Sequence, residues 1–323
     1  MPYAATIDDI REARDRIAKY AHVTPVFRCE TLSQMAGRSL FFKAENLQKV
    51  GAFKFRGAMN AVLQLSEEEA AVGVVTHSSG NHAQALALAA RMRGIPATII
   101  MPNNAVPAKK AAVLDYGAEV VECIPTLAAR ETAAQAVMDA KGGTFIHPYN
   151  HPHIIAGQGT SALELMEQVP DLDAIIAPVG GGGLMSGICV AVRGVQPWTK
   201  LIAAEPAGAD DFARSMQQGT YIPQTEPKTL ADGLLTSTGD LTWPILRDHV
   251  HAVFTSEDPE IIAAMRLLWE RAKLFVEPSA AVGLAVVLAA EFKALEGMER
   301  IGIVLSGGNP DLDALPWVTG GTS

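Results

Sequence analysis

The stretch "DAIIAPVGGGGLMSGICVAVRGV", residues 173–195, joins an apolar run to four consecutive glycines and then to a helical pattern. The run 173–179 shows no polar alternation, so we predict a strand that is buried on both faces. A strand that leads through glycines into a helix is typical of parallel α/β proteins. Exposed N–H groups and the positive end of the helix would bind an anion there. The predicted phosphate site consists of Gly180, Gly181, Gly182 and Gly183.

A tight helix–strand contact or a flexible loop would also explain these glycines. The run matches neither the GxxxxGK[ST] pattern of nucleoside triphosphatases nor the GxGxxG pattern of NAD sites. The phosphate is therefore expected to belong to another ligand.

The same alternation of apolar runs and helical patterns extends through the chain. It predicts strands at 72–77, 97–102, 118–123, 200–206 and 300–308, and helices at 82–94, 107–117 and 128–140. An amphipathic helix is expected after Thr6, which forms a capping motif with Asp9. Since no Pro/Gly/Ser-rich linker divides the chain, we expect it to cross between two domains, with the active site in the cleft between them.

Composition excludes several classes of protein. The 323 residues are 49% hydrophobic and 19% charged, which is typical of a folded chain with about two domains. A net charge of −9 argues against binding nucleic acid. No apolar stretch approaches the roughly 20 residues that cross a bilayer, and no secretory signal is recognisable. Three widely spaced cysteines indicate a reducing compartment, so we expect a cytoplasmic protein.

Lys54 is the first candidate catalytic residue. It stands between Phe53 and Phe55, and apolar surroundings lower the pKa of an amine, which suits Schiff-base chemistry. A lysine that extends along a strand edge into solvent is the alternative.

The stretch "THSSGNHAQA", residues 76–85, is a second predicted turn between a strand and a helix. Its hydroxyl, amide and N–H groups could bind a carboxylate or an oxyanion. The same residue types also cap helices without binding any ligand.

A phosphate site, a lysine in apolar surroundings and a carboxylate-binding turn are together what pyridoxal 5′-phosphate chemistry requires. "KAENLQKVGAFKFRGA", "SSGNHAQA", "PVGGGGL" and "LSGGN" occur in the order found in fold-type II pyridoxal-phosphate enzymes. The chain resembles the group of serine racemases, serine/threonine dehydratases and 3-hydroxyaspartate dehydratases from about residue 6 to about residue 315. The resemblance implies a tryptophan synthase β-like α/β fold, in which two open parallel-sheet domains enclose the cofactor.

The resemblance also implies roles for the cofactor-binding residues. Lys54 would form the Schiff base with the cofactor, and Phe53 would pack against its ring. Asn81 would bind the phenolic oxygen, and the Leu184 amide would bind the phosphate together with the four glycines. Ser306 would meet the pyridine nitrogen; a hydroxyl there favours prompt expulsion of a β-leaving group.

On the substrate side, the resemblance assigns the turn Ser78, Ser79, Asn81 and His82 to the substrate carboxylate. Ser79 would lie opposite Lys54 and could exchange a proton on that face. Arg130 matches a racemase arginine that reaches toward the substrate, although a solvated helix arginine is the alternative reading.

Two positions depart from the racemase pattern. Ala83 stands where racemases have glycine, and Thr236 stands where they have a serine that faces the substrate.

His151 is a candidate ligand for a second substrate carboxylate. His249 and His251 alternate in a stretch that resembles a strand.

"AAEPAGADDF", residues 203–212, resembles the divalent-cation site of the family. Glu205 and Asp211 would supply carboxylates and Ala209 its carbonyl oxygen, and such an all-oxygen set suits Mg²⁺ or Ca²⁺. Two surface acids are the alternative.

The sequence therefore predicts a large cofactor-binding domain at 1–72 and 151–323 and a small mobile domain at 73–150 that closes over the substrate. The expected reaction is α,β-elimination of L-serine, L-threonine or 3-hydroxyaspartate to a 2-oxo acid and ammonia, with racemisation of serine as a second activity and a homodimer as the assembly. A predominant serine racemase, a nucleotide-binding α/β protein and a non-catalytic amino-acid sensor remain alternatives.

Overall fold

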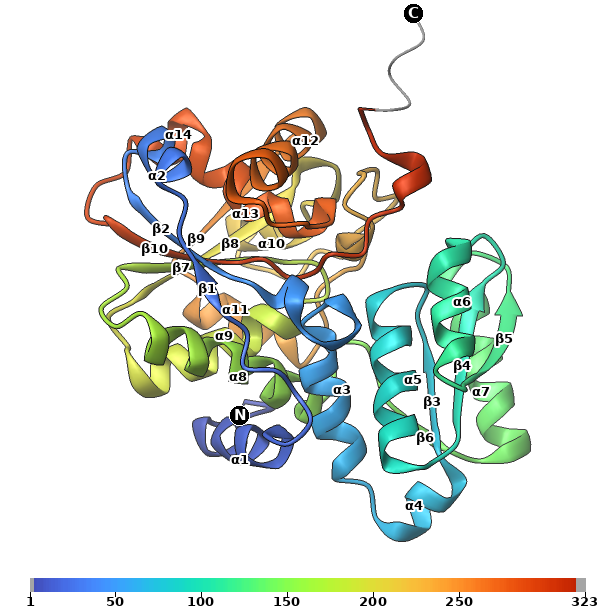
Figure 1. Ribbon diagram of the computed structural model, residues 1–323. Coiled ribbons are helices and arrows are strands. Elements are labelled where there is room, and N and C mark those ends of the chain that lie inside the picture. Colours follow the sequence, from blue (N-terminus) through green and yellow to red (C-terminus); the bar gives the residue numbers. More distant parts are fainter. Residues whose placement is uncertain (1–2, 318–323) are drawn as a thin grey trace, which may run out of the picture.

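The computed structural model describes residues 3–317 and contains two β-sheets (Figure 1). The larger sheet has the order β1-β2-β10-β7-β8-β9, and the smaller has the order β5-β4-β3-β6. The large sheet contains β1 (Val26–Phe27), β2 (Ser39–Lys43), β7 (Ala174–Pro178), β8 (Lys200–Pro206), β9 (Ala252–Ser256) and β10 (Arg300–Val304). The small sheet contains β3 (Val74–His77), β4 (Ala97–Pro102), β5 (Glu119–Cys123) and β6 (Thr144–Phe145).

The strands pair in parallel throughout both sheets except that β1 is antiparallel to β2. The predicted α/β class with two parallel sheets is confirmed. Fourteen helices surround them in the described part of the chain: α1 (Ile7–Ile17), α2 (Glu30–Ala36), α3 (Lys54–Leu63), α4 (Glu67–Val72), α5 (Asn81–Arg93), α6 (Pro107–Asp115), α7 (Leu127–Lys141), α8 (Pro152–Gln168), α9 (Gly183–Val195), α10 (Asp211–Gln218), α11 (Thr242–His249), α12 (Asp258–Leu267), α13 (Pro278–Leu288) and α14 (Ala290–Lys293).

Both faces of the large sheet are covered by helices. Ile175 and Ala177 of β7 pack into a core with residues of α1, α8, α9 and α11, whereas Ala174 and Ile176 pack into a second core with residues of α12, α13 and α14. Burial of successive residues in opposite cores explains why this strand is a continuous apolar run.

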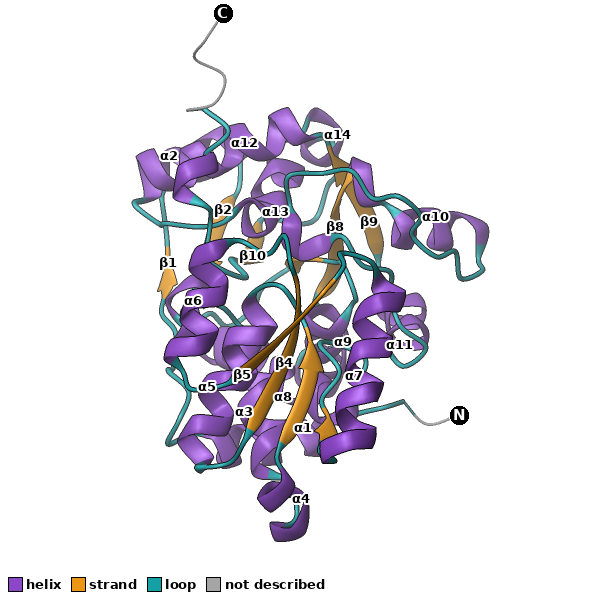
Figure 2. Cartoon of the chain, turned by 90° about the vertical axis from the view of Figure 1, so that its right-hand side faces the viewer, coloured by secondary structure: helices purple, strands orange, loops and turns teal. Residues whose placement is uncertain are grey.

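The small sheet is covered in the same way (Figure 2). Ile99 and Met101 of β4 pack with residues of α3, α5 and α6, whereas Ile100 packs with residues of α7. Helix α3 thus contributes to the core of the small sheet, and it also packs against α8 beside the large sheet.

Local sequence signals predicted the first helix well and one later helix badly. Thr6 and Asp9 form the expected capping box at the start of α1. The strand-like interpretation around His249 is wrong, because His249 is the last residue of α11. Ile245 and Leu246 bury one face of that helix, and Pro244 lies in its first turn, where proline is tolerated.

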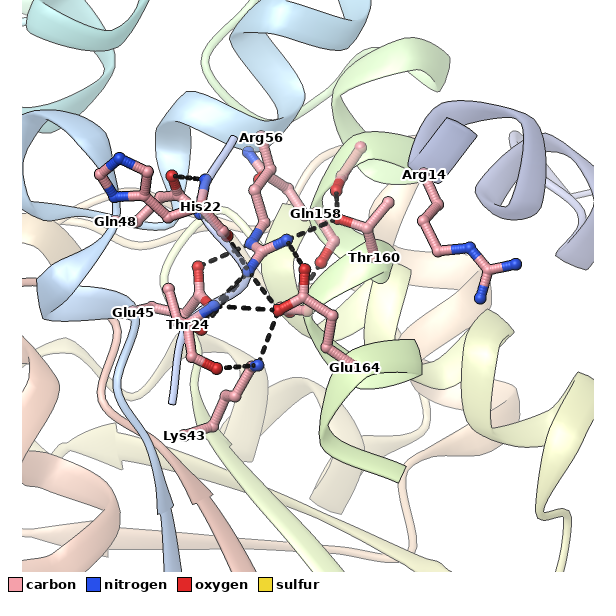
Figure 3. A network of polar contacts seen from close by, with 12 residues as sticks. Arg14, His22, Thr24, Lys43, Glu45, Gln48, Arg56, Gln158, Thr160 and Glu164 are labelled. Atoms are coloured by element: carbon pink, nitrogen blue, oxygen red, sulfur yellow. Dashed lines mark hydrogen bonds and ion pairs between the residues drawn. The ribbon is translucent and has the colours of Figure 1, made fainter. Parts of the chain in front are cut away.

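A buried network of charges fixes the position of α3 (Figure 3). Arg56 binds Glu45 through Nε and Nη2 at 2.7 and 2.9 Å, and Glu164 through Nη1 and Nη2 at 2.6 and 2.8 Å. Lys43 donates to Glu164 at 2.7 Å and to the Thr24 carbonyl at 2.8 Å. Two cations and two carboxylates therefore pair with one another and tie α3 to β2 and α8.

The small sheet uses one continuous segment, from β3 to β6, whereas the strands of the large sheet come from both sides of that segment. The domain limits at residues 72, 73, 150 and 151 stay a prediction. Within residues 3–317, every helix is too short or too polar to cross a bilayer.

Candidate active site

Lys54 begins α3 and lies at the junction of several segments. Its Nζ donates to the Pro148 carbonyl at 2.8 Å and lies 5.1 Å from the centre of the Phe53 ring. Phe53 in turn donates its backbone N–H to the carbonyl of Ser306, which is buried after β10. Burial lowers the pKa of Lys54 to about 8, although Glu277 acts in the opposite direction. An amine with this pKa is partly neutral near neutrality and can act as a nucleophile or a base.

The four glycines connect β7 to α9, and Tyr149 packs against Gly181 and Gly183. A Cβ on Gly181 would lie 2.2 Å from Cγ of Tyr149, and Gly182 has a φ of +83°, which favours glycine. The glycines are therefore required by neighbouring protein atoms. The N–H groups in the first turn of α9, including that of Leu184, have no acceptor within the helix, so they could bind an anion.

The polar turn between β3 and α5 contributes Asn81 and His82. Asn81 donates from Nδ2 to Glu277 at 2.7 Å and accepts at Oδ1 from Asn309 at 2.8 Å. His82 is buried; its Nε2 lies 3.2 Å from the Ile146 carbonyl, and its Nδ1 has no hydrogen-bond partner among the described residues. Burial, followed by the charge of Lys54, lowers the pKa of His82, which keeps its ring neutral.

The two serines of this turn differ in their contacts. The Ser78 hydroxyl accepts from the Gly80 N–H at 3.3 Å, so it supports the turn itself. The half-buried Ser79 hydroxyl has no hydrogen-bond partner within residues 3–317 and is available to a ligand.

Arg130, Thr236 and Tyr149 lie near one another although they come from distant parts of the chain. Burial raises the pKa of Tyr149 to about 12, while a hydrogen bond with the Thr236 side chain and the charge of Arg130 oppose this rise. The Arg130 Nε is buried without a partner in the described structure. Its charge also contributes, after burial, to lowering the pKa of His77 to about 4. The arrangement offers a cation that no carboxylate of the described chain neutralises.

His151 caps α8, with its Nδ1 accepting from the His153 N–H at 3.2 Å. Its predicted contact with a second substrate carboxylate stays a prediction.

Two of the predicted metal ligands form a separate buried acidic pair. Glu205 is the second-last residue of β8 and accepts from the N–H groups of Phe212 and Ala213 at 3.3 and 2.7 Å. Asp211 begins α10 and accepts at Oδ2 from the Thr238 N–H at 3.2 Å, while its Oδ1 has no partner in the described structure. Burial, followed by the charge of Asp211, raises the pKa of Glu205, and burial raises that of Asp211 to about 6. Ala209 is also buried.

The pair falls short of a complete metal centre made of side chains. In the part of the chain that the structure describes, no three His, Cys, Asp or Glu side chains converge as metal ligands. A cation here would need backbone and water oxygens as further ligands.

Three residues near Lys54 were not predicted from the sequence, namely Tyr149, His147 and Glu277. His147 accepts at Nδ1 from the Asn150 N–H at 3.0 Å, and its ring centre lies 4.5 Å from that of Tyr149. No local signal distinguishes Tyr149 or His147. Glu277 precedes a proline at the start of α13, which resembles an ordinary helix N-terminus.

Comparison with known proteins gives consistent results. A family model described as pyridoxal-phosphate dependent enzyme matches residues 17–307. A serine racemase of Arabidopsis thaliana is 53% identical over 316 residues, covering 97% of this chain and 96% of that protein. A β-hydroxyaspartate dehydratase of Paracoccus denitrificans is 48% identical over 315 residues, covering 98% and 99%. The solved structure of maize serine racemase has a TM-score of 0.96 at 48% identity, covering 98% of this chain and 97% of that one.

Proposed function

Because the chain belongs to the family of pyridoxal-phosphate-dependent enzymes, we propose that it eliminates water from a small β-hydroxy amino acid and releases a 2-oxo acid and ammonia. Racemisation of serine is proposed as its second activity. The observation that carries the proposal is the buried Lys54 amine, whose pKa is lowered to about 8. It binds the Pro148 carbonyl next to Tyr149, the residue that packs against Gly181 and Gly183.

The residues around Lys54 fit the cofactor. The N–H groups at the start of α9 would hold its phosphate, and Phe53 would pack against its ring. Asn81 would donate to the phenolic oxygen, and the Ser306 hydroxyl would meet the pyridine nitrogen. When bound, pyridoxal phosphate supplies an electron sink for the charge that develops as the substrate Cα loses its proton.

Lys54 is proposed as the base that removes the Cα proton, since its lowered pKa leaves the amine partly neutral at neutral pH. The turn that contains Ser78, Ser79, Asn81 and His82 would bind the substrate carboxylate.

Among the candidate substrates, 3-hydroxyaspartate is favoured by Arg130. Its buried Nε lacks a partner in the described structure, and a second substrate carboxylate would supply one. Thr236 and Tyr149 would line the same side of the site. Replacing Arg130 by Met should lower kcat/KM for 3-hydroxyaspartate about 10- to 100-fold, as expected for loss of a charged hydrogen bond. A similar loss with serine would contradict this substrate assignment.

Ser79 is proposed as the second proton donor and acceptor. Lys54 serves one face of Cα, so inversion needs another group on the opposite face, and the Ser79 hydroxyl is free to fill this role. A predominant serine racemase is the second candidate function, favoured by this free hydroxyl.

The test follows both enantiomers of serine and both C2 configurations of 3-hydroxyaspartate by chiral chromatography. Ser79→Ala should lower the rate of racemisation about 100-fold or more, while elimination from the Lys54 face continues. Ser78→Ala is the matched variant. We expect it to lower the activity on all substrates alike, because Ser78 supports the turn. Unchanged racemisation in Ser79→Ala would exclude it as the second base.

We also propose a divalent cation, Mg²⁺ or Ca²⁺, bound by Glu205, Asp211 and the Ala209 carbonyl. The unpartnered Oδ1 of Asp211 and the burial of two neighbouring carboxylates support a cation there.

The remaining proposals concern the whole molecule. The segment 73–150 would move as a small domain against 1–72 and 151–323 to close over the substrate. A homodimer is proposed from the family resemblance, and a cytoplasmic location from the three widely spaced cysteines. Sedimentation at several protein concentrations would test the dimer.

A further inference from the structure

Glu277 is a buried carboxylate that lies next to the proposed cofactor site. It immediately precedes α13 and is 2% exposed. Its Oε1 accepts from Asn81 Nδ2 at 2.7 Å, and its Oε2 accepts from the Asn309 N–H at 3.2 Å. Its own N–H donates to the Gly307 carbonyl at 3.0 Å.

Asn309 completes a closed set of contacts around the Asn81 amide. The Asn309 Nδ2 donates to Asn81 Oδ1 at 2.8 Å and to the Val50 carbonyl at 2.7 Å. The ionised form of Glu277 only accepts hydrogen bonds, so this form requires the amino group of Asn81 on its side. The amide oxygen and one N–H of Asn81 are thus occupied, and its second N–H remains available.

The glycine after Ser306 provides the space for these contacts. A Cβ on Gly307 would lie 2.4 Å from Glu277 Oε1 and 3.0 Å from Asn81 Nδ2. Close approach of the carboxylate and the amide therefore accounts for the absence of a side chain at this position of the "LSGGN" segment.

Charge connects Glu277 with Lys54. Glu277 is the group that counteracts the burial-induced fall in the pKa of Lys54. Burial raises the pKa of Glu277 itself to about 7; Asp232 adds to that rise, and Lys109, which binds Asp232 at 2.5 Å, opposes it. Two cations, Lys54 and Lys109, and one anion, Asp232, thus interact electrostatically with the Glu277 carboxylate.

We propose that Glu277 is a positioning residue, which orients the Asn81 amide toward the phenolic oxygen of the cofactor and provides the counter-charge for Lys54. This inference rests on the proposed function, in particular on the assignment of Asn81 to the cofactor. Glu277 acts through Asn81 and Lys54 and is not itself assigned a contact with the substrate.

The test uses the cofactor-loaded full-length enzyme and the variants Glu277→Gln and Glu277→Asp. One readout is the pH midpoint of the visible absorbance band that reports the proton shared by Lys54 and the cofactor. Loss of the carboxylate in Glu277→Gln should lower this midpoint by about one pH unit, because a cation loses its neighbouring anion. Cofactor affinity should fall about 10- to 100-fold, which is typical for residues that orient a binding group. Glu277→Asp keeps the charge and should lie between Glu277→Gln and the wild type.

Glu257→Gln is the matched control, since Glu257 precedes α12 as Glu277 precedes α13 but is exposed. It should change neither readout. A merely structural role would lower the melting temperature of Glu277→Gln without moving the pH midpoint, and this result would overturn the proposal. If Glu277→Gln does not fold, a wild-type midpoint and affinity in Glu277→Asp would likewise overturn it.

Asn81→Ala separates this inference from the proposed function. If Asn81→Ala weakens cofactor binding but Glu277→Gln behaves as the wild type, Glu277 does not position Asn81. If Asn81→Ala itself leaves affinity and spectrum unchanged, the cofactor assignment of Asn81 is wrong, and the inference fails with it.

Discussion

Buried charges occur in two neighbouring regions of this molecule, and the two regions differ in how these charges are paired. In the network around Arg56, both guanidinium edges bind carboxylates, and Lys43 binds Glu164 as well (Figure 3). At Lys54, only two residues before Arg56, the buried amine binds a single neutral carbonyl. One region joins its charges in direct ion pairs, whereas Lys54 makes no ion pair with a carboxylate of the described residues.

The same contrast extends to other groups of the candidate sites. His82 Nδ1, Arg130 Nε and Asp211 Oδ1 are buried without partners in the described structure. Since an unpaired buried polar group costs stability, each of these three groups would gain from a ligand that pairs with it. Incomplete pairing does not identify a ligand site by itself, since Arg38 Nη1, Gln158 Nε2 and Ser256 Oγ are also buried without partners in the described structure.

The largest expected effect comes from removing the unpaired amine. Lys54→Ala should lower turnover more than about 10³-fold and eliminate the visible absorbance of the covalently bound cofactor. The fold should persist, because Lys54 makes one hydrogen bond to a neutral carbonyl. Lys110→Ala, at a partly exposed lysine on α6, is the control and should retain activity. Wild-type absorbance in Lys54→Ala would refute the site.

In the network around Arg56, we expect a substitution to lower the stability of the fold. Arg56→Met leaves Glu45 and Glu164 buried without their partner and should lower the free energy of unfolding by about 3–5 kcal/mol. Arg14→Met removes an exposed ion pair with Glu167, whose side chains are 40% and 64% exposed, and should cost less than about 1 kcal/mol. Urea unfolding measures both, and equal losses would contradict the distinction between the regions.

The acidic pair should respond to cations. Mg²⁺ or Ca²⁺ at about 100 times its dissociation constant should stabilise the wild type by about 2.7 kcal/mol, and a chelator should reverse this. Glu205→Ala and Asp211→Ala should lose the response in thermal unfolding. Should both variants respond as the wild type does, the cation binds elsewhere.

The smallest effect concerns pH. Binding of cofactor to the cofactor-free protein requires a neutral Lys54 amine, whose pKa is lowered to about 8 from its ordinary 10.5. The binding rate should therefore rise with pH and level off above about 8, and it should fall about tenfold per pH unit below that value. Stopped-flow absorbance between pH 6 and 10 would measure it. A rate that still rises tenfold per unit beyond pH 9 would mean that burial does not lower this pKa.

Elements that depend on local interactions were predicted from the sequence, whereas features that depend on contacts between distant segments were not. The capping box at Thr6 and the apolar run at 174–178 are local signals, and both predicted the observed elements. The motif around Lys54 predicted an amine in apolar surroundings, and the amine is buried near the Phe53 ring; its catalytic role stays a prediction. Predicting His249 as part of a strand failed because burial of Ile245 and Leu246 on a helix face decides that segment.

Contacts between distant segments could not be predicted. The glycines after β7 suggested close approach of a ligand, but Tyr149 is what excludes a side chain at Gly181. Likewise, nothing in the sequence near Arg56 or Glu277 reveals that their partners lie at Glu164 and Asn81. Such pairings become visible only when the two sheets and their helices are assembled.

The strand order of the large sheet has a consequence for synthesis of the chain. β10 lies between β2 and β7, with Ile301 beside Leu40 and Ala174, so this sheet stays incomplete until almost the whole chain has left the ribosome. The small sheet, built from one continuous segment, can form earlier. Since Phe53 is held by the Ser306 carbonyl just after β10, Lys54 reaches its final surroundings only at the last stage of folding. A prematurely terminated chain would therefore carry a folded small sheet without a working lysine.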